Sequence, residues 1–131
     1  MTSPKHYTIS SAPTPVAPYS HAVEADNWVI ITGQLPIDPE NEAAHLPDGI
    51  EAQTRLTMKN LEAVLSHVGL GFEHVLQARV FLTDFYRDYE VMNAVYSEYF
   101  DAERRPARTC IGVTGLARHA LVEIDFIAKR P

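Results

Sequence analysis

The sequence predicts an α+β fold in which two helices pack on one face of a mixed β-sheet. Three observations lead to this prediction: short β-branched runs, two longer segments with a helical period, and an order in which strands separate the helices. The 131 residues are few enough for one domain and sufficient for that domain to bury its own core. We therefore expect a single domain over residues 1–131.

The first part of the chain is expected to supply edge strands and one central strand. Residues 6–9 and 21–24 are candidate short strands, and residues 13–18 form a proline-rich, irregular connection because proline fixes φ and lacks an amide donor. Residues 28–32 (WVIIT) form a continuous apolar, β-branched run typical of a central strand. Residues 40–48 are polar, and their pattern predicts no regular element.

Two amphipathic segments predict the helices, and an alternating strand over residues 75–83 lies between them. The first helix is expected from about residue 49 to 68, and Gly69 supplies its C-terminal stop. The second is expected over residues 88–100. Its buried stripe consists of Met92, Val95, Tyr96, Tyr99 and Phe100.

The last two strands, over residues 108–113 and 121–128, are expected to form a hairpin with a turn near residues 115–119. Apolar residues at 122, 124, 126 and 128 mark the core face of the final strand, so Glu123 and Asp125 lie on the other face. If Cys110 lies opposite Glu123 in the hairpin, then Arg108 lies opposite Asp125 and the four side chains form one cluster. A slip of one residue would separate them.

Composition limits the classes of function. The net charge is −6 and no basic run occurs, which argues against nucleic acid as a partner. No segment has the length of a membrane span or the pattern of a signal peptide, so a soluble cytoplasmic protein without a membrane partner is expected. The one cysteine and the scattered histidines show no ligand spacing, so no metal site is expected.

Arg108, Glu123 and Cys110 are the candidates for chemistry. A guanidinium group matches a carboxylate bidentately, so Arg108 is a candidate anchor for an acidic substrate, although an ion pair with Asp125 or Glu123 across the hairpin is the simpler interpretation. Glu123 lies between apolar neighbours; desolvation would raise its pKa and suit it to proton transfer, whereas an ordinary solvated glutamate is the alternative. Cys110 is interpreted as a pocket-lining or buried thiol because no histidine partner is assured.

Three further residues have a functional and an ordinary interpretation. Gly33 after the central strand permits a ligand to approach the backbone, or it only makes a turn. Asn93 braces a loop or faces solvent. Tyr19, directly after Pro18, covers a cleft or is an exposed loop tyrosine.

The motifs taken together resemble the RidA family, also called the YjgF family, of small enamine/imine deaminases. The resemblance extends over nearly the whole chain, and its most specific part is a Pro-Ala-Arg segment with a glutamate downstream. The matching segments are PYS (18–20), TGQLP (32–36), NL (60–61), NAVY (93–96), RPARTC (105–110) and VEID (122–125). Thr32 in place of a common serine, and a turn at 116–119 without the usual proline, are departures that bear on substrate identity.

This resemblance implies a chorismate-mutase-like protomer, a homotrimer, and substrate sites in the clefts between subunits. Arg108 would bind the substrate carboxylate and Glu123 would position or activate water. The remaining substrate-binding residues implied are Tyr19, Thr32, Gly33, Asn93 and Cys110. No metal or organic cofactor is implied, because an imine is already electrophilic.

The function expected from this resemblance is hydrolysis of reactive 2-enamine/2-imine acids, such as 2-aminoacrylate and 2-iminobutyrate, to 2-keto acids and ammonia, as in metabolite damage repair. One alternative is a dedicated catabolic deaminase such as 2-aminomuconate deaminase, for which Arg105 or Arg118 is a candidate second cation; the simpler interpretation of both arginines is a surface charge. The other is a non-catalytic module that binds small ligands in the same cleft.

Overall fold

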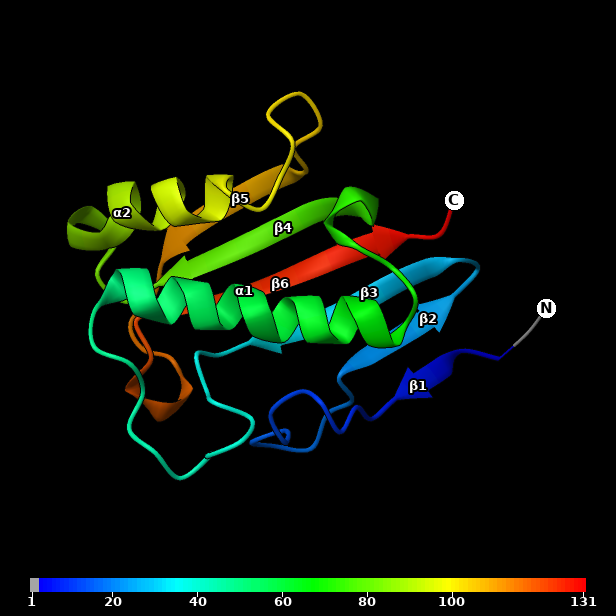
Figure 1. Ribbon diagram of the computed structural model, residues 1–131, viewed down its shortest axis with the longest axis horizontal. Helices are drawn as coiled ribbons and strands as arrows, with labels where there is room; N and C mark the ends of the chain where they lie inside the picture. Colours follow the sequence, from blue (N-terminus) through cyan, green and yellow to red (C-terminus); the bar gives the residue numbers. More distant parts are fainter. Residues whose placement is uncertain (1–2) are drawn as a thin grey trace.

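The computed structural model describes residues 3–131, which form a six-stranded mixed sheet with two α-helices against one of its faces (Figure 1). The strands are β1 (Lys5–Tyr7), β2 (Ala22–Ala25), β3 (Trp28–Gln34), β4 (Val75–Leu82), β5 (Ala107–Gly112) and β6 (Val122–Lys129), and the helices are α1 (Ile50–His67) and α2 (Phe85–Ser97). The spatial order of the strands is β1-β2-β3-β6-β4-β5. The predicted α+β class is confirmed.

The core lies between the helices and the sheet. Side chains that are fully buried there come from α1 (Met58, Leu61, Val64, Leu65), from β3 (Val29, Ile31), from β4 (Ala78, Val80, Leu82) and from β6 (Val122, Ile124, Phe126). The apolar stripe of α1 and the alternate apolar residues of the strands thus face the same core, as the helical and strand periods predict. The stop at Gly69 is confirmed as well, because α1 ends two residues before it and Gly69 has a positive φ of 79°.

The second helix begins three residues earlier than predicted and ends three residues earlier. Asp84 caps it, and its carboxylate accepts a hydrogen bond from the amide of Arg87 at 3.4 Å. An N-cap aspartate satisfies an amide that has no partner inside the helix, which fixes where the helix starts. Phe100 lies beyond the helix but is still buried in the core.

The predicted terminal hairpin is wrong, because β4 lies between β5 and β6. Strands β4 and β5 are parallel and α2 connects them, whereas β6 is antiparallel to β4. When a strand, a helix and a second strand follow one another and both strands join the same sheet, the helix serves as the crossover and the two strands are parallel. The chain then crosses the end of β4, where Val113 donates to the Leu82 carbonyl (2.9 Å) and Thr83 donates to the Leu121 carbonyl (3.1 Å).

The corrected topology also places Arg108 and Glu123 on opposite faces of the sheet, contrary to the prediction of a shared face. Arg108 lies beside Ala78 of β4, whose side chain is buried under the helices, so Arg108 lies on the helical side. Glu123 lies beside Phe81 on the other side. The predicted Arg108–Asp125 register is wrong too: Asp125 accepts from Arg79 of β4 at 2.7 Å.

The face of the sheet opposite the helices is apolar in part and has no helical layer within residues 3–131 (Figure 1). Trp28 and Ile30 of β3 are 42% and 56% exposed there, and Ile111 of β5 is 46% exposed. Large exposed apolar side chains gathered on one sheet face are typical of a surface that another protein surface covers.

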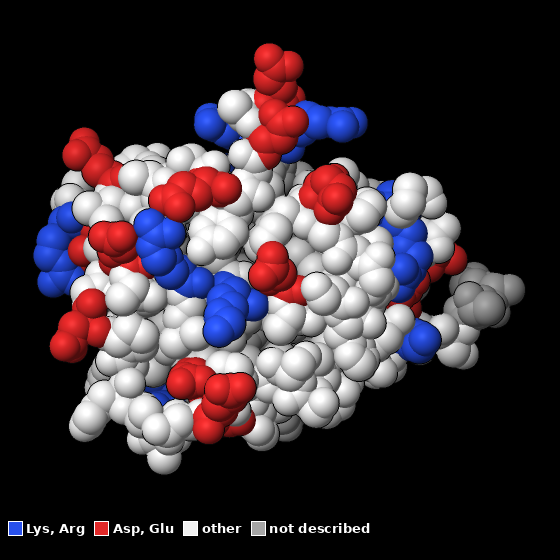
Figure 2. All heavy atoms as spheres, viewed as in Figure 1, with Lys and Arg blue, Asp and Glu red and all other residues white. Residues whose placement is uncertain are grey.

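Charged side chains of both signs are interspersed over the helical face, with no continuous basic patch in that view (Figure 2). The loop between α2 and β5, which projects from the top edge in Figure 1, also carries both signs. None of the helices within residues 3–131 is long and apolar enough to cross a membrane.

Candidate active site

The predicted site residues gather in two separate places within one chain. Tyr19, Thr32, Gly33 and Glu123 line a cavity of about 390 Å³, together with Val16, Ala17, Leu35 and Ala117; we call these residues the glutamate half-site. Asn93 and Arg108 line a second cavity of about 320 Å³ with Tyr96, Ser97, Arg105 and Pro106; we call these residues the arginine half-site. The predicted pair of Arg108 and Glu123 is therefore divided between two cavities.

The glutamate half-site depends on a close approach between Gly33 and Glu123. Strand β3 pairs with β6, and the register shifts between Ile31 and Gln34, which brings Gly33 against the Glu123 side chain. A Cβ atom on Gly33 would overlap the Glu123 carboxylate. A side chain at this position would displace the Glu123 carboxylate from where it lies, which favours the close-approach interpretation of Gly33 over a plain turn.

Glu123 lies in an environment that favours its protonated form. Burial raises the pKa of the carboxyl group, and the neighbouring negative charge of Asp125 raises it further, while Arg79 opposes both effects. Desolvation and like charge both penalise the ionised carboxylate. Of the two interpretations of Glu123, the structure favours the partly desolvated carboxyl group over the ordinary solvated glutamate, and a raised pKa makes the carboxylate a stronger base.

Hydrogen bonds to the backbone fix the remaining walls of the glutamate half-site. The Thr32 hydroxyl donates to the Ser20 carbonyl at 2.6 Å, and the Thr32 amide donates to the His21 carbonyl at 3.1 Å. The Tyr19 hydroxyl accepts from the Val16 amide at 3.1 Å, which closes a small loop over the cavity wall. Thr32 therefore orients the segment that carries Tyr19.

His21 anchors the same segment, a role that no pattern in the sequence indicates. Its ring is buried; Nδ1 accepts from the Ile9 amide at 2.8 Å, and Nε2 lies 2.7 Å from the Pro13 carbonyl. Because Nδ1 accepts a hydrogen bond, the proton of the neutral ring is on Nε2 and is donated to Pro13. An isolated histidine without ligand spacing does not reveal such a contact.

Two other polar side chains hold the loops near the glutamate half-site. Buried Asn60 of α1 donates to the carbonyls of Leu35 (2.9 Å) and Ile37 (2.8 Å), which ties the end of β3 to the helical layer. Arg118 donates to the carbonyls of Glu42 (3.2 Å) and Ala44 (3.1 Å). Arg118 thus fixes the 40–48 loop and does not line the cavity that contains Arg108.

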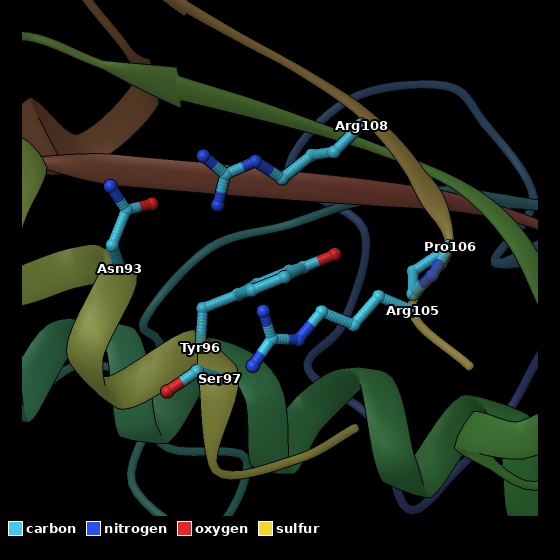
Figure 3. A pocket seen from close by; sticks show the side chains of 6 residues that line it. All are labelled: Asn93, Tyr96, Ser97, Arg105, Pro106 and Arg108. Carbon is cyan, nitrogen blue, oxygen red and sulfur yellow. The ribbon is translucent and has the colours of Figure 1, made fainter. Parts of the chain in front are cut away.

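In the arginine half-site, Arg108 extends from the edge strand β5 over aromatic rings of α2 (Figure 3). Its guanidinium carbon lies 5.0 Å from the centroid of the Tyr96 ring and 5.9 Å from that of Tyr89. Cation–π contacts of this kind hold a guanidinium group in place and leave its N–H donors available. Within residues 3–131, Arg108 forms no ion pair with a carboxylate.

Two buried polar atoms of this half-site have no hydrogen-bond partner among residues 3–131. They are the amide oxygen of Asn93 and the hydroxyl of Tyr96. Burial raises the pKa of the Tyr96 phenol to about 12, although Arg108 and Arg105 lower it in part. Tyr96 therefore remains protonated at neutral pH and can donate to a bound acceptor. Buried polar atoms without partners are costly, so a ligand, a water molecule or a second chain that bonded them would be favoured here.

Cys110 lies two residues after Arg108 on the same face of β5, but it is not among the residues that line this cavity. It is half-buried against the core, and burial raises the pKa of its thiol, which Arg108 opposes. A raised thiol pKa disfavours the nucleophilic thiolate at neutral pH. Across residues 3–131, histidine, cysteine, aspartate and glutamate side chains form no group of three or more that could hold a metal ion.

The sequence matches the family described as "Endoribonuclease L-PSP" over residues 9–130. It is 38% identical over 122 residues to a RutC family protein of Synechocystis, with 93% of each chain covered. It is 41% identical over 116 residues to the 3-aminoacrylate deaminase RutC of Acinetobacter baylyi, with 88% of this chain and 90% of the relative covered.

Solved structures of the same family have the same fold. RidA from an Antarctic Psychrobacter superimposes with a TM-score of 0.90 at 33% identity, over 96% of this chain and 99% of that one. TdcF of E. coli, solved with bound serine, superimposes with a TM-score of 0.88 at 30% identity, over 97% and 99% of the two chains.

Proposed function

The chain belongs to the RidA/YjgF family, and from this premise we propose that it is a deaminase that hydrolyses 2-enamine/2-imine acids to 2-keto acids and ammonia. The observation that carries the proposal is the pair of half-sites, one with a desolvated carboxylate and one with a guanidinium group free of internal ion pairs within residues 3–131. The 41% identity to a 3-aminoacrylate deaminase supports the same class of reaction. A carboxylate-bearing imine needs both an anion anchor and a proton carrier.

The proposal requires more than one copy of the chain. Arg108 and Glu123 lie on opposite faces of the sheet, so a small substrate held by Arg108 cannot reach Glu123 of the same chain. A homotrimer in which the arginine half-site of one copy meets the glutamate half-site of the next would complete the site. The apolar sheet face with Trp28, Ile30 and Ile111 is the surface that such an assembly would bury.

In this mechanism Arg108 binds the carboxylate next to the C=N bond, and Glu123 transfers two protons from oxygen to nitrogen. Glu123 takes the first from water as the water oxygen bonds to the imine carbon, and returns it to nitrogen to give a carbinolamine. It takes the second from the new hydroxyl group as the C–N bond breaks, and returns it to the departing ammonia. One imine and one water thus give one keto acid and one ammonia, and Glu123 ends as it began.

The electrostatic environment of Glu123 suits this exchange. A carboxylate whose pKa is raised by burial and by a neighbouring negative charge is a stronger base than a solvated carboxylate. General acid–base catalysis is typically worth about 10²–10⁴-fold. That gain fits a substrate that already hydrolyses slowly in water.

The charge distribution favours a small-molecule substrate over RNA. The net charge is −6, and the helical face shows acidic and basic side chains interspersed (Figure 2). Binding to a phosphate backbone depends on a continuous basic surface.

The test is Arg108→Ala, with Arg108→Lys beside it, in a coupled assay of imine disappearance with 2-aminoacrylate and 2-iminobutyrate. Loss of a buried charge partner costs several kcal/mol, so we expect kcat/KM to fall by about 30-fold or more for Ala, and by less for Lys, which keeps the charge but not the fork. A wild-type rate for Arg108→Ala would refute the role of Arg108 as the carboxylate-binding residue. Inactivity of the wild type on every imine would refute the proposed deaminase activity.

A further inference from the structure

The arginine half-site contains a second cation, Arg105, whose side chain enters the same cavity as Arg108 (Figure 3). None of the side chains that line this cavity is acidic. Within one copy of the chain these two positive charges have no counter-charge in the cavity, which is unexpected in a chain whose net charge is −6. A concave site lined by one sign of charge concentrates ligands of the opposite sign.

Other arginines of the chain show the contrast. Arg55, Arg79, Arg87 and Arg130 each pair with at least one carboxylate at 3.2 Å or closer. Within residues 3–131, Arg105 forms no such ion pair and no side-chain hydrogen bond. The donors of Arg105 are therefore available to a ligand, as are those of Arg108.

Tyr96 connects the two cations. In Figure 3 its ring lies between the two guanidinium groups, and both groups act on the phenol electrostatically. The hydroxyl is buried and has no partner within residues 3–131, and Tyr96 as a whole is only 6% exposed. This hydroxyl is therefore a donor without an acceptor on a residue that contacts the cavity of both arginines.

The backbone restricts where the two cations can lie. Pro106 separates Arg105 from the start of β5 at Ala107, and proline limits the residue before it to extended conformations. Arg108 is held in the strand and over the Tyr96 ring. The backbone positions of the two anchors are thus set before a ligand binds, and the Arg108 side chain is held as well, whereas a ligand would have to order the exposed Arg105 side chain.

From these contacts we propose that Arg105 binds a second carboxylate, so that the site prefers imines of dicarboxylic amino acids to imines of monocarboxylic ones. Arg108 binds the carboxylate next to the C=N bond, and Arg105 with Tyr96 binds the carboxylate at the far end of the side chain. One cavity wall, in a single chain, presents both cations, and the glutamate half-site of the next copy would complete the space between them. This inference rests on the proposed function for its substrate, but not for its prediction about binding.

The first experiment measures binding without turnover. We would titrate 2-oxoglutarate and 2-oxobutyrate, stable product-like acids with two and one carboxylates, into the full-length protein in a calorimeter. Arg105→Ala should weaken binding of the dicarboxylate by about 3- to 10-fold, as loss of one partly exposed charge pair predicts, and should change binding of the monocarboxylate by less than about twofold. The matched control is Arg104→Ala, the adjacent exposed arginine that does not line the cavity.

The second experiment compares turnover of imines generated in situ from glutamate or aspartate with those from 2-aminobutyrate or alanine. We expect a higher kcat/KM for the dicarboxylic imines in the wild type and loss of that preference in Arg105→Ala. Equal effects of Arg104→Ala and Arg105→Ala, or equal losses for both classes of ligand, would overturn the role of Arg105. If all imines are hydrolysed without a preference for the dicarboxylic ones, the role of Arg105 is wrong but the proposed deaminase activity stands. If the protein binds the dicarboxylate through Arg105 but hydrolyses no imine, only the deaminase activity is wrong.

Discussion

The two half-sites are built from different kinds of contact. In the glutamate half-site, a carboxylate is held against backbone, because Gly33 has no side chain and β3 lies directly beside β6. In the arginine half-site, guanidinium groups lie over and beside the aromatic ring of Tyr96 at the edge of the sheet. The first arrangement desolvates a charge and raises a pKa, whereas the second leaves charges accessible to a ligand.

This difference corresponds to two chemical tasks. A proton carrier needs a pKa shifted toward the working pH, and burial between strands provides that shift. A binding group needs hydrogen-bond donors that are held in place but are not already paired with carboxylates of the same chain. A guanidinium group that lies over an aromatic ring meets both requirements. Substitutions in the two half-sites should therefore have distinguishable effects on turnover and on binding.

The largest effect is expected for Glu123→Gln, which keeps the shape of the side chain against Gly33 but removes the proton carrier. The turnover number should fall by about 100-fold or more, the range of general acid–base catalysis, while affinity for 2-keto acids changes little. Steady-state kinetics and calorimetric titration would check this. Glu62→Gln on the exposed surface of α1 is the control, and a parallel loss of binding and turnover in Glu123→Gln would contradict the division of tasks.

Gly33→Ala should reduce both activity and stability. The added methyl group overlaps the Glu123 carboxylate, so the carboxylate or the strands must move. Because the flexible carboxylate can move aside, the loss of stability should be at the low end of overpacking, about 1 kcal/mol, whereas the displaced carboxylate should lower kcat by about 10-fold or more. Thermal unfolding and kinetics provide the measurements.

Gly115→Ala is the matched control for that substitution, because a Cβ at Gly115 would meet no atom within 4 Å. It should leave the unfolding temperature and kcat near wild type. Equal behaviour of the two alanine variants would show that the contact between Gly33 and Glu123 is unimportant.

A smaller effect concerns the pH dependence of stability. The native pKa of Glu123 lies above its ordinary value of 4.5, so the native state holds this proton more tightly than the unfolded chain. Stability therefore falls as pH rises from the ordinary value through the native pKa, and the wild type carries this cost at neutral pH. Glu123→Gln lacks the cost, so its unfolding temperature should exceed that of the wild type at neutral pH and match it below the ordinary pKa. A difference that is constant over this range would contradict the raised pKa.

The smallest effect is expected at Thr32. Thr32→Ser keeps the hydroxyl that donates to the Ser20 carbonyl, so activity should stay within about twofold of wild type. Thr32→Val keeps the volume but removes the hydrogen bond, which should cost about 0.5–1.5 kcal/mol of stability and loosen the segment that carries Tyr19. Chemical denaturation of the two variants measures the difference.

Much of the fold follows from local patterns in the sequence. The period of α1, the alternation of β6 and the stop at Gly69 all depend on residues close together in the chain, and the structure confirms them. The start of α2 was missed by three residues, because the capping aspartate lies before the apolar stripe on which the prediction depended. Local rules predict an element better than they predict its ends.

The pairing of the last strands could not be predicted in the same way. Neighbours in sequence suggested a hairpin, but β4 fills the space between β5 and β6 and pairs with both. Strand order is decided by how all the apolar faces are buried together, and a single strand pattern contains no information about that.

The sequence by itself determined which residues are candidates for chemistry, because the residue types of Arg108, Glu123 and Gly33 and the resemblance they carry are properties of the chain. Only the tertiary structure decided that Arg108 and Glu123 lie on opposite faces, that Arg118 holds a loop and that Arg105 shares the cavity of Arg108. The physical reason is that the side of a sheet on which a residue lies follows from strand pairing across the whole fold. The single cluster that the sequence pattern predicts is therefore divided in the structure into two half-sites, which lie on opposite faces of the sheet.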